Sequence, residues 1–156
     1  MVTEVETVLS SMRGIWDEVS VDELDHALQA GELARVDGVD DELIVAALLH
    51  DVAHSPLIDR GTDHDRAARE WLTPRLGARV GWLAGAHVMA KRFLAADAAY
   101  AGTLSDVSRH SLSMQGGVGA VGPDWTGHRW WADAIRLRRY DDGAKLPGAP
   151  AFTMAE

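Results

Sequence analysis

The chain has 156 residues, 47% of them hydrophobic and 25% charged, which is typical of one globular domain, so we expect a single domain over residues 1–156. It contains no cysteine, which excludes disulfides and thiolate metal sites and favours a cytoplasmic location. The formal net charge of −9 argues against nucleic acid and anionic membranes as partners, and no apolar run is long enough to span a membrane.

Apolar residues at helical spacing predict helices from the start of the chain. This spacing covers residues 3–12 and 21–36. Asp40 is a predicted N-cap for the next helix, which is apolar on almost every side and should therefore be buried at the centre of the fold. Ser55-Pro56 is expected to close that helix.

The second half of the chain continues in the same way. Further helices are predicted over about 64–72, 78–95, 105–114 and 128–143. Thr73-Pro74 is expected to open a short turn, and the glycine-rich stretch 116–127 to form a loop. Because no strand alternation or hairpin signal is present, the predicted fold class is all-α, a compact bundle of five to seven helices.

The segment LLHDVAHS, residues 48–55, places two histidines around an aspartate. On an α-helix His50, Asp51 and His54 would stand at relative angles of about 0°, 100° and 40°, so all three would project from one arc. Imidazole together with carboxylate suits iron, manganese, zinc or cobalt, and a carboxylate can bridge two ions. The segment is therefore a candidate metal site.

Four further residues strengthen this interpretation. A lone histidine on an apolar helix face is more often a hydrogen-bonded core residue than a ligand. Here, however, His26, His64 and His87 lie on successive predicted helices, and Asp141 lies in the last one. Histidines on several helices, with a His-Asp pair among them, favour a metal centre over isolated core histidines.

The order of these residues resembles the HD-domain superfamily of helical metalloproteins. More narrowly, the chain is similar to the mixed-valent diiron oxygenases of that superfamily, above all the phosphonate-cleaving PhnZ type and more distantly the myo-inositol oxygenases. The resemblance spans nearly the whole chain and rests on the blocks LDHALQAGELA (24–34), AALLHDVAH (46–54), DHDRAAREWL (63–72), AHVMAKRFL (86–94), LSDVSRHSLSMQGG (104–117) and LRRYDDGAKLPG (137–148). It implies a single HD domain.

The resemblance also implies two iron ions, in a mixed-valent Fe(II)/Fe(III) state, with O2 as co-substrate. Asp141 rather than Asp142 is the implied ligand, because the family pattern D-x-x-x-K places the ligand four residues before a lysine, here Lys145. Asp51 would bridge the two ions. The implied ligands are His26, His50, Asp51 and Asp141 for one iron, and Asp51, His64 and His87 for the other.

Substrate-binding residues are implied in the same way. Lys91 lies one turn after His87 on the same helix face, so its ammonium group could reach an anion, although a lysine in general is more often a solvated surface residue. Lys91 and His54 are the implied catalytic residues, and both would contact substrate. A second-shell hydrogen-bond donor is the alternative role for His54. The further implied substrate contacts are Ser111, Gln115 and Arg138, whose guanidinium can donate two hydrogen bonds to a phosphonate.

One stretch departs from the family pattern. PhnZ-type enzymes carry a tyrosine and a glutamate before the first histidine, in a loop that can cover the metal and contact the substrate's amine. Here Trp16 is near the tyrosine position and Glu18 is near the glutamate position, offset by one residue. We therefore regard both as a possible lid or amine-end contact, and packing of Trp16 in the core as the competing interpretation.

The implied reaction is oxidative cleavage of the carbon–phosphorus bond of a small anionic α-hydroxyphosphonate, giving phosphate and a carboxylic acid. Three alternatives are open at this point. They are a metal-dependent phosphohydrolase, in which the metal would generate hydroxide, a diiron oxygenase acting on a polyol or amino alcohol, and a helical binding module without catalysis. The implied assembly is a monomer or a small homo-oligomer.

Overall fold

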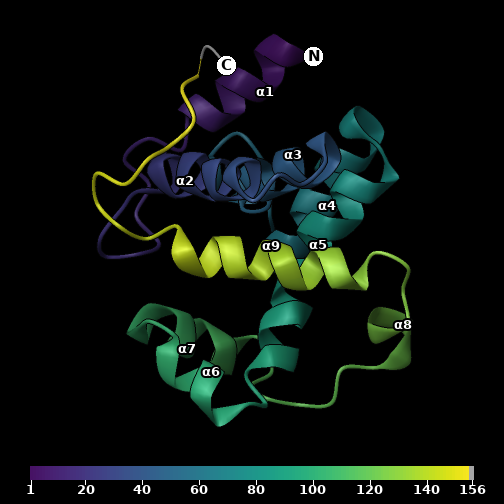
Figure 1. The fold of residues 1–156 in the computed structure, drawn as a ribbon. Coiled ribbons are helices and arrows are strands. Elements are labelled where there is room, and N and C mark those ends of the chain that lie inside the picture. Colours follow the sequence, from purple (N-terminus) through teal and green to yellow (C-terminus); the bar gives the residue numbers. More distant parts are fainter. Residues whose placement is uncertain (155–156) are drawn as a thin grey trace.

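The computed structural model describes residues 1–154, which contain nine α-helices, one short 3₁₀ helix and no β-strand. The all-α prediction is therefore confirmed, although the described helices outnumber the five to seven expected. In chain order (Figure 1) they are α1 (Val2–Ser10), α2 (Glu23–Val36), α3 (Asp41–Leu49), the 3₁₀ helix η1 (Val52–His54), α4 (His64–Leu76), α5 (Ala78–Leu94), α6 (Ala98–Thr103), α7 (Asp106–Met114), α8 (Pro123–Thr126) and α9 (Trp131–Gly143).

The two unpredicted helices are short, and each begins at a local signal. The Asp97 side chain accepts hydrogen bonds from the backbone N–H groups of Ala99 and Tyr100, which satisfies two donors at the start of α6. Helix α8 begins with Pro123 at its first position, where the missing N–H would have no intrahelical partner. The prediction of a continuous loop over residues 116–127 is therefore wrong for the four residues of α8.

The predicted turn at Thr73-Pro74 is also wrong, because α4 continues through Pro74 to Leu76. A proline inside a helix removes one backbone hydrogen bond, and near the end of α4 the helix tolerates this loss. The helix ends instead at Gly77, whose φ of 97° is disfavoured for other residues. This glycine lets α5 start at once and fold back against α4.

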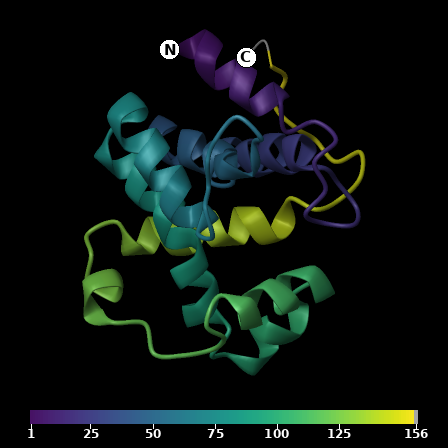
Figure 2. The same cartoon turned by 180° about the vertical axis from the view of Figure 1, so that it is seen from behind.

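Five helices enclose the main core. Helix α4 packs against α5, α2 against α3, and α9 against both α2 and α5. In Figures 1 and 2, α9 lies between the α2–α3 pair on one side and α6 and α7 on the other. Helices α6 and α7 take part in a separate, smaller apolar cluster of Ala95, Leu104 and Leu112 with Tyr100 packed against it. We call residues 98–114 the α6–α7 lobe.

The segment from His50 to His54 is not one regular α-helix. Helix α3 ends at Leu49, and the chain then turns through His50 and Asp51 into the 3₁₀ helix. The expectation that the segment continues as a helix up to Ser55-Pro56 is therefore wrong. The break widens the spacing between side chains, and it lets Asp51 face residues of several other helices at once.

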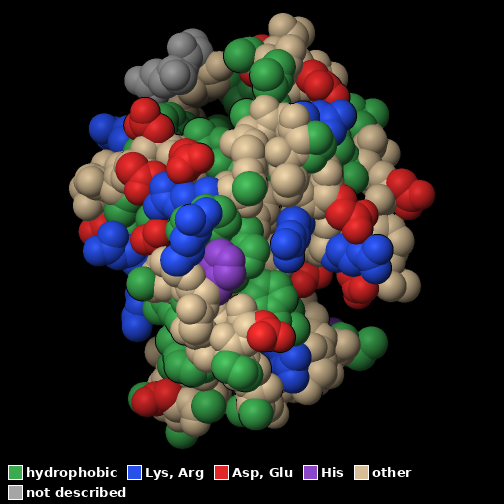
Figure 3. All heavy atoms as spheres, turned by 90° about the vertical axis from the view of Figure 1, so that its right-hand side faces the viewer, with side chains coloured by type: hydrophobic (Ala, Val, Ile, Leu, Met, Phe, Trp, Pro, Cys, Tyr) green, Lys and Arg blue, Asp and Glu red, His purple; other side chains and the backbone are tan. Residues whose placement is uncertain are grey.

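The surface carries mixed charge. On the face shown in Figure 3, acidic and basic side chains lie interspersed and the hydrophobic side chains do not form one large patch. Arg79 of α5 illustrates the pairing, because it forms ion pairs with Asp40, Glu42 and Asp133 and so joins the start of α3 to α9. None of the described helices is long and apolar enough to cross a membrane.

Candidate metal centre

Side chains from three separate parts of the chain meet at the centre of the bundle. Nitrogen or oxygen atoms of His26, His50, Asp51 and Asp141 all lie within 4.8 Å of one another. The Nε2 atom of His26 is 3.4 Å from Asp141 Oδ1 and 3.5 Å from Asp51 Oδ2. The Nε2 atom of His50 is 3.0 Å from the same Asp51 oxygen. This set of two imidazoles and two carboxylates is suited to a first-row transition metal.

The other oxygen of Asp51 faces a second set of imidazoles. Its Oδ1 atom is 3.3 Å from Nε2 of His87 and 3.5 Å from Nε2 of His64, and these two nitrogens are 3.3 Å apart. Oδ1 is buried but accepts no hydrogen bond within the described chain. A buried carboxylate oxygen without a partner is costly. A cation held between Oδ1 and the two imidazoles would remove this cost, so the residues fit a second ion.

The backbone fixes which ring nitrogen of the histidines faces the centre. Nδ1 of His26 lies 2.8 Å from the carbonyl oxygen of Ala144. His50 and His87 make the same contact within their own segments, with the carbonyl oxygens of Ala47 at 2.8 Å and Ala84 at 2.5 Å. A carbonyl oxygen can only accept, so each Nδ1 carries the proton. In the neutral ring Nε2 then has a free lone pair for a metal ion.

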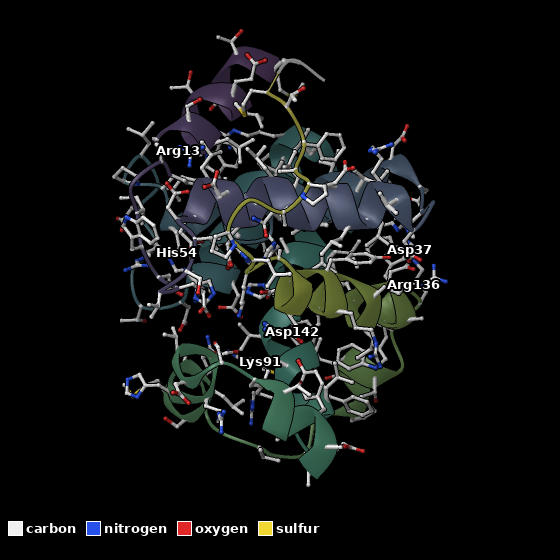
Figure 4. The ribbon with its side chains drawn as sticks, turned by 60° about the vertical axis from the view of Figure 1, so that its left-hand side comes forward. Arg13, Asp37, His54, Lys91, Arg136 and Asp142 are labelled. Atoms are coloured by element: carbon white, nitrogen blue, oxygen red, sulfur yellow. The ribbon has the colours of Figure 1, made fainter. Side chains whose placement is uncertain are left out.

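His54 has the opposite tautomer. Nη1 of Arg60 lies 3.1 Å from its Nδ1, and a guanidinium can only donate, so Nδ1 accepts and Nε2 carries the proton of the neutral ring. That proton points to the centre, since Nε2 is 3.7 Å from Asp51 Oδ1. In this tautomer His54 donates from Nε2, although Asp51, His54 and His64 also lie close enough together to hold a metal ion. Figure 4 shows His54 at the edge of the site, away from Lys91.

The negative charge of the carboxylates at the centre also has to be balanced by cations. Burial alone would lower the pKa of His26, but hydrogen bonds to Asp141 and Asp51 raise it to about 10. Burial likewise opposes the ionised form of Asp141, yet the charges of Arg138 and His50 hold its pKa well below the usual range. The carboxylates of the centre are therefore ionised, and cations, as protons on the imidazoles or as metal ions, balance their charge.

His64 differs from the other histidines. Burial, with the nearby rings of His87 and His54, lowers the pKa of His64 to about 4, although the charge of Asp51 opposes this shift. The ring is therefore neutral at pH 7 even without a metal. It lies at the first position of α4, with 20% of its side chain exposed at the wall of the cavity described next.

A cavity of about 260 Å³ opens onto the centre. Three basic side chains line it, Lys91 from α5, Arg138 from α9 and Lys145 after α9, together with the carboxylates of Asp17, Glu18 and Glu23. The ammonium group of Lys91 is buried and donates a hydrogen bond of 2.8 Å to the Ser111 hydroxyl. Burial, and then the charge of Arg138, lower the pKa of Lys91 to about 8. Of these three cations, Arg138 already pairs with Asp141 and Asp142, and Lys145 pairs with Glu18. Lys91, whose hydrogen-bond partner is a neutral hydroxyl, is therefore the cation most available to an anion in the cavity.

Comparison with curated proteins decides the family. A hydroxymethylphosphonate dioxygenase of Gimesia maris is 36% identical over 148 residues, which cover 87% of this chain and 73% of that protein. The chain belongs to the PhnZ-like HD-domain dioxygenases. A glycine-betaine-forming 1-hydroxy-2-(trimethylamino)ethyl phosphonate dioxygenase of Leisingera caerulea is 36% identical over 102 residues, covering 60% of this chain and 52% of that protein.

A third similarity is more distant. An uncharacterized protein of Acanthamoeba polyphaga mimivirus is 29% identical over 137 residues, which cover 80% of this chain and 63% of that protein. No protein-family model matches the chain. Membership of the PhnZ-like dioxygenases therefore rests on the hydroxymethylphosphonate dioxygenase, and it agrees with the family resemblance of the sequence blocks.

Most residues that the sequence singled out converge in this PhnZ-like chain. All six predicted ligands lie at the centre, and Ser111 and Gln115 line the cavity from α7 and its C-cap. The oxygen of the Gln115 amide is buried and has no hydrogen-bond partner in the described chain. The roles of these residues stay predictions, and the geometry brings them together as the predictions require.

Two predicted contacts are placed differently from expectation. The Trp16 ring is 62% exposed and does not line the cavity, so packing of Trp16 in the core is excluded. Glu18 does line it, but its carboxylate already pairs with Lys145 at 2.9 Å and accepts a hydrogen bond from Ser105 at 3.0 Å. Glu18 is therefore neutralised by a neighbour and is not free to meet a cationic group.

Sequence reasoning missed several lining residues. The sequence pattern used Lys145 only to identify Asp141 as the ligand. It did not predict that Ser108 and Arg60 line the cavity. Glu23 was also missed. It lies three residues before His26, is 2% exposed, and has one carboxylate oxygen without a partner. The spacing to His26, close to one helical turn, was the available signal, since it places both side chains on one face of α2.

Proposed function

We propose that this protein uses a dinuclear iron centre and O2 to cleave the carbon–phosphorus bond of a small α-hydroxyalkylphosphonate. The reaction R–CH(OH)–PO3H2 + O2 → R–COOH + H3PO4 balances in atoms. It removes four electrons from the substrate and reduces O2 by four electrons. The two phosphonate dioxygenases to which the chain is similar support this reaction class.

The proposal rests on one observation: the two oxygens of the Asp51 carboxylate face two different pairs of histidines. One oxygen faces His26 and His50, and the other, unpartnered within the described chain, faces His64 and His87. A hydrolase that needs a single metal ion has no use for the second pair of imidazoles. These residues would hold two iron ions, which would supply the redox chemistry for O2 when bound.

The chain's own residues bind and orient the substrate in this proposal. Lys91 neutralises the phosphonate, while the Ser111 hydroxyl and the Gln115 amide accept or donate hydrogen bonds at its oxygens. From the opposite side of the cavity, the Nε2–H group of His54 donates a hydrogen bond to the substrate. Fixing the phosphonate at one end holds the C–H bond toward the centre.

Oxygen consumption coupled to phosphate release tests the proposal. The protein is loaded with Fe(II) under anaerobic conditions and supplied with hydroxymethylphosphonate and with the 2-amino and 2-trimethylammonio derivatives of 1-hydroxyethylphosphonate. We expect one phosphate per O2 consumed with at least one of these compounds, and none without O2. Cyclitols and amino alcohols in the same panel test the oxygenase alternative.

A phosphohydrolase would give a different result. Release of phosphate from a phosphate monoester by the manganese- or zinc-loaded protein, without O2 uptake on any phosphonate, would contradict the proposal. A Lys91→Ala variant is the internal control, because it should raise the KM for the phosphonate far more than it lowers iron content. An unchanged KM would remove Lys91 from the substrate site.

A further inference from the structure

Three side chains connect the α6–α7 lobe to the metal centre, and of these Arg138 is buried while Tyr100 and Asp142 are half-buried. The Tyr100 hydroxyl of α6 donates a hydrogen bond of 2.5 Å to Asp142 Oδ2. The other oxygen of Asp142 accepts from Nε of Arg138 at 3.0 Å and also from its Nη2. Nη1 of Arg138 then reaches Oδ2 of Asp141 at 2.6 Å. The path runs from a helix of the lobe, across two side chains of α9, to a carboxylate of the metal centre.

These contacts use most of the hydrogen-bonding capacity of Arg138. A guanidinium has five N–H donors. Two of them bind Asp142 and one binds Asp141, which leaves one on each Nη atom. Arg138 is only 3% exposed, yet it lines the cavity. The forked contact with a phosphonate that the sequence suggested is therefore not available on the Nε edge, which Asp142 occupies.

Keeping the Arg138 side chain in one orientation lowers the entropic cost of ligand binding. An arginine loses side-chain conformational entropy when a ligand fixes it. In the folded chain Asp142 fixes Arg138 before any ligand arrives, and Tyr100 fixes Asp142. Figure 4 shows Asp142 at the end of α9 that faces Lys91. Asp142 and its partner Arg138 therefore lie beside the basic side chains of the cavity.

We propose that Asp142 and Tyr100 are positioning residues for this site. They orient the guanidinium of Arg138 so that one N–H holds Asp141 toward the metal centre and the remaining N–H groups meet the anionic end of the substrate. Since Tyr100 belongs to the lobe that also supplies Ser111, its hydroxyl also sets the distance between the two sides of the anion pocket. The inference depends on the proposed function only in taking the ligand to be a phosphonate or phosphate anion.

A second tyrosine provides a matched control. Tyr140 of α9 also donates its hydroxyl to an aspartate, Asp37 at the end of α2, and Tyr140 is 8% exposed. Neither Tyr140 nor Asp37 lines the cavity. In Figure 4 Asp37 lies well apart from Asp142, toward the other end of α9. Tyr100→Phe and Tyr140→Phe therefore remove the same kind of hydrogen bond, one beside the site and one remote from it.

The experiment measures binding of inorganic phosphate to the metal-loaded protein by calorimetry, together with the metal content and the Tm of each variant. We expect Tyr100→Phe to raise the Kd for phosphate about fivefold, which corresponds to about 1 kcal/mol. Asp142→Asn should raise it tenfold or more, and Asp142→Glu, which keeps the carboxylate, should recover most of that loss. Tyr140→Phe should change the Kd less than twofold, although its Tm falls as much as that of Tyr100→Phe.

Three results would overturn the inference. One is a phosphate Kd of Tyr100→Phe within twofold of the wild-type value. The other is an equal rise in Tyr140→Phe, since that would mean that the Kd merely follows stability. Absence of phosphate binding by the wild-type protein would overturn it as well. The proposed function fails separately, because the wild-type protein could bind phosphate in the expected order of variants and still consume no O2 with any hydroxyphosphonate.

Discussion

Lys91 predicts a pH dependence whose size follows from its surroundings. The ammonium group is 3% exposed, lies near Arg138 and Lys145, and has a pKa lowered to about 8 by burial and then by the charge of Arg138, with Asp141 and Asp51 acting in the opposite direction. The charged form is the one that attracts a phosphonate. With a pKa of about 8, roughly 90% of the side chains are charged at pH 7 and roughly 10% at pH 9. Apparent affinity for the anion should therefore fall about tenfold across this interval.

The assay is kcat/KM for the phosphonate between pH 6.5 and 9.5, because this ratio reports groups of the free enzyme. Bound metal ions repel the ammonium charge, so they can move the inflection below pH 8 but not above it. Lys91→Arg is the control, since a guanidinium stays charged over the whole range and should remove the inflection. Titration of the substrate's own phosphonate affects both proteins equally. An inflection of equal size in Lys91→Arg, or a flat profile in the wild type, would refute the reasoning.

Three further outcomes are expected. We expect the wild type to bind two metal ions and His87→Ala to bind one. The control His110→Ala, on the exposed surface, should keep both. Retention of two ions by His87→Ala in metal analysis would contradict the assignment. Chelation of the metal should lower the Tm of the wild type, because cations stabilise the folded state that binds them; an unchanged Tm in calorimetry would argue against metal binding. Gly81→Ala should cost about 1–3 kcal/mol in chemical denaturation, since its new Cβ would lie 2.1 Å from Thr73 Oγ1, whereas Gly102→Ala in α6 meets no atom within 4 Å and should be neutral.

The sequence located the centre better than its surroundings. His26, His87 and Asp141 could be found because each lies on a helix whose apolar face the sequence predicts, so their convergence follows from packing those faces together. The segment around Asp51 was expected to be helical, and the break after Leu49 could not be predicted because the apolar pattern continues across it.

Pairings between side chains were out of reach for a different reason. The contacts of Arg138 with Asp142 and of Glu18 with Lys145 depend on rotamers and on elements distant in the chain, and composition carries no signal for either. The exposure of Trp16 is of the same kind, because a tryptophan is usually buried and only the path of its loop shows otherwise. The reaction class could be predicted from the residues at the centre. The side-chain contacts that bear on substrate specificity could not be predicted from the sequence.

The two apolar clusters imply an order of events on heating. The six metal-binding candidates belong to α2, α4, α5, α9 and the segment after α3, which surround the large core, whereas Ser111 and Gln115 belong to α7 and its C-cap, next to a cluster of only three buried residues. Segments with few buried apolar contacts open at lower free-energy cost than the global transition. Amide protons of α6 and α7 should therefore exchange sooner than those of α5, and a warmed sample should release its anion while it still retains its metal.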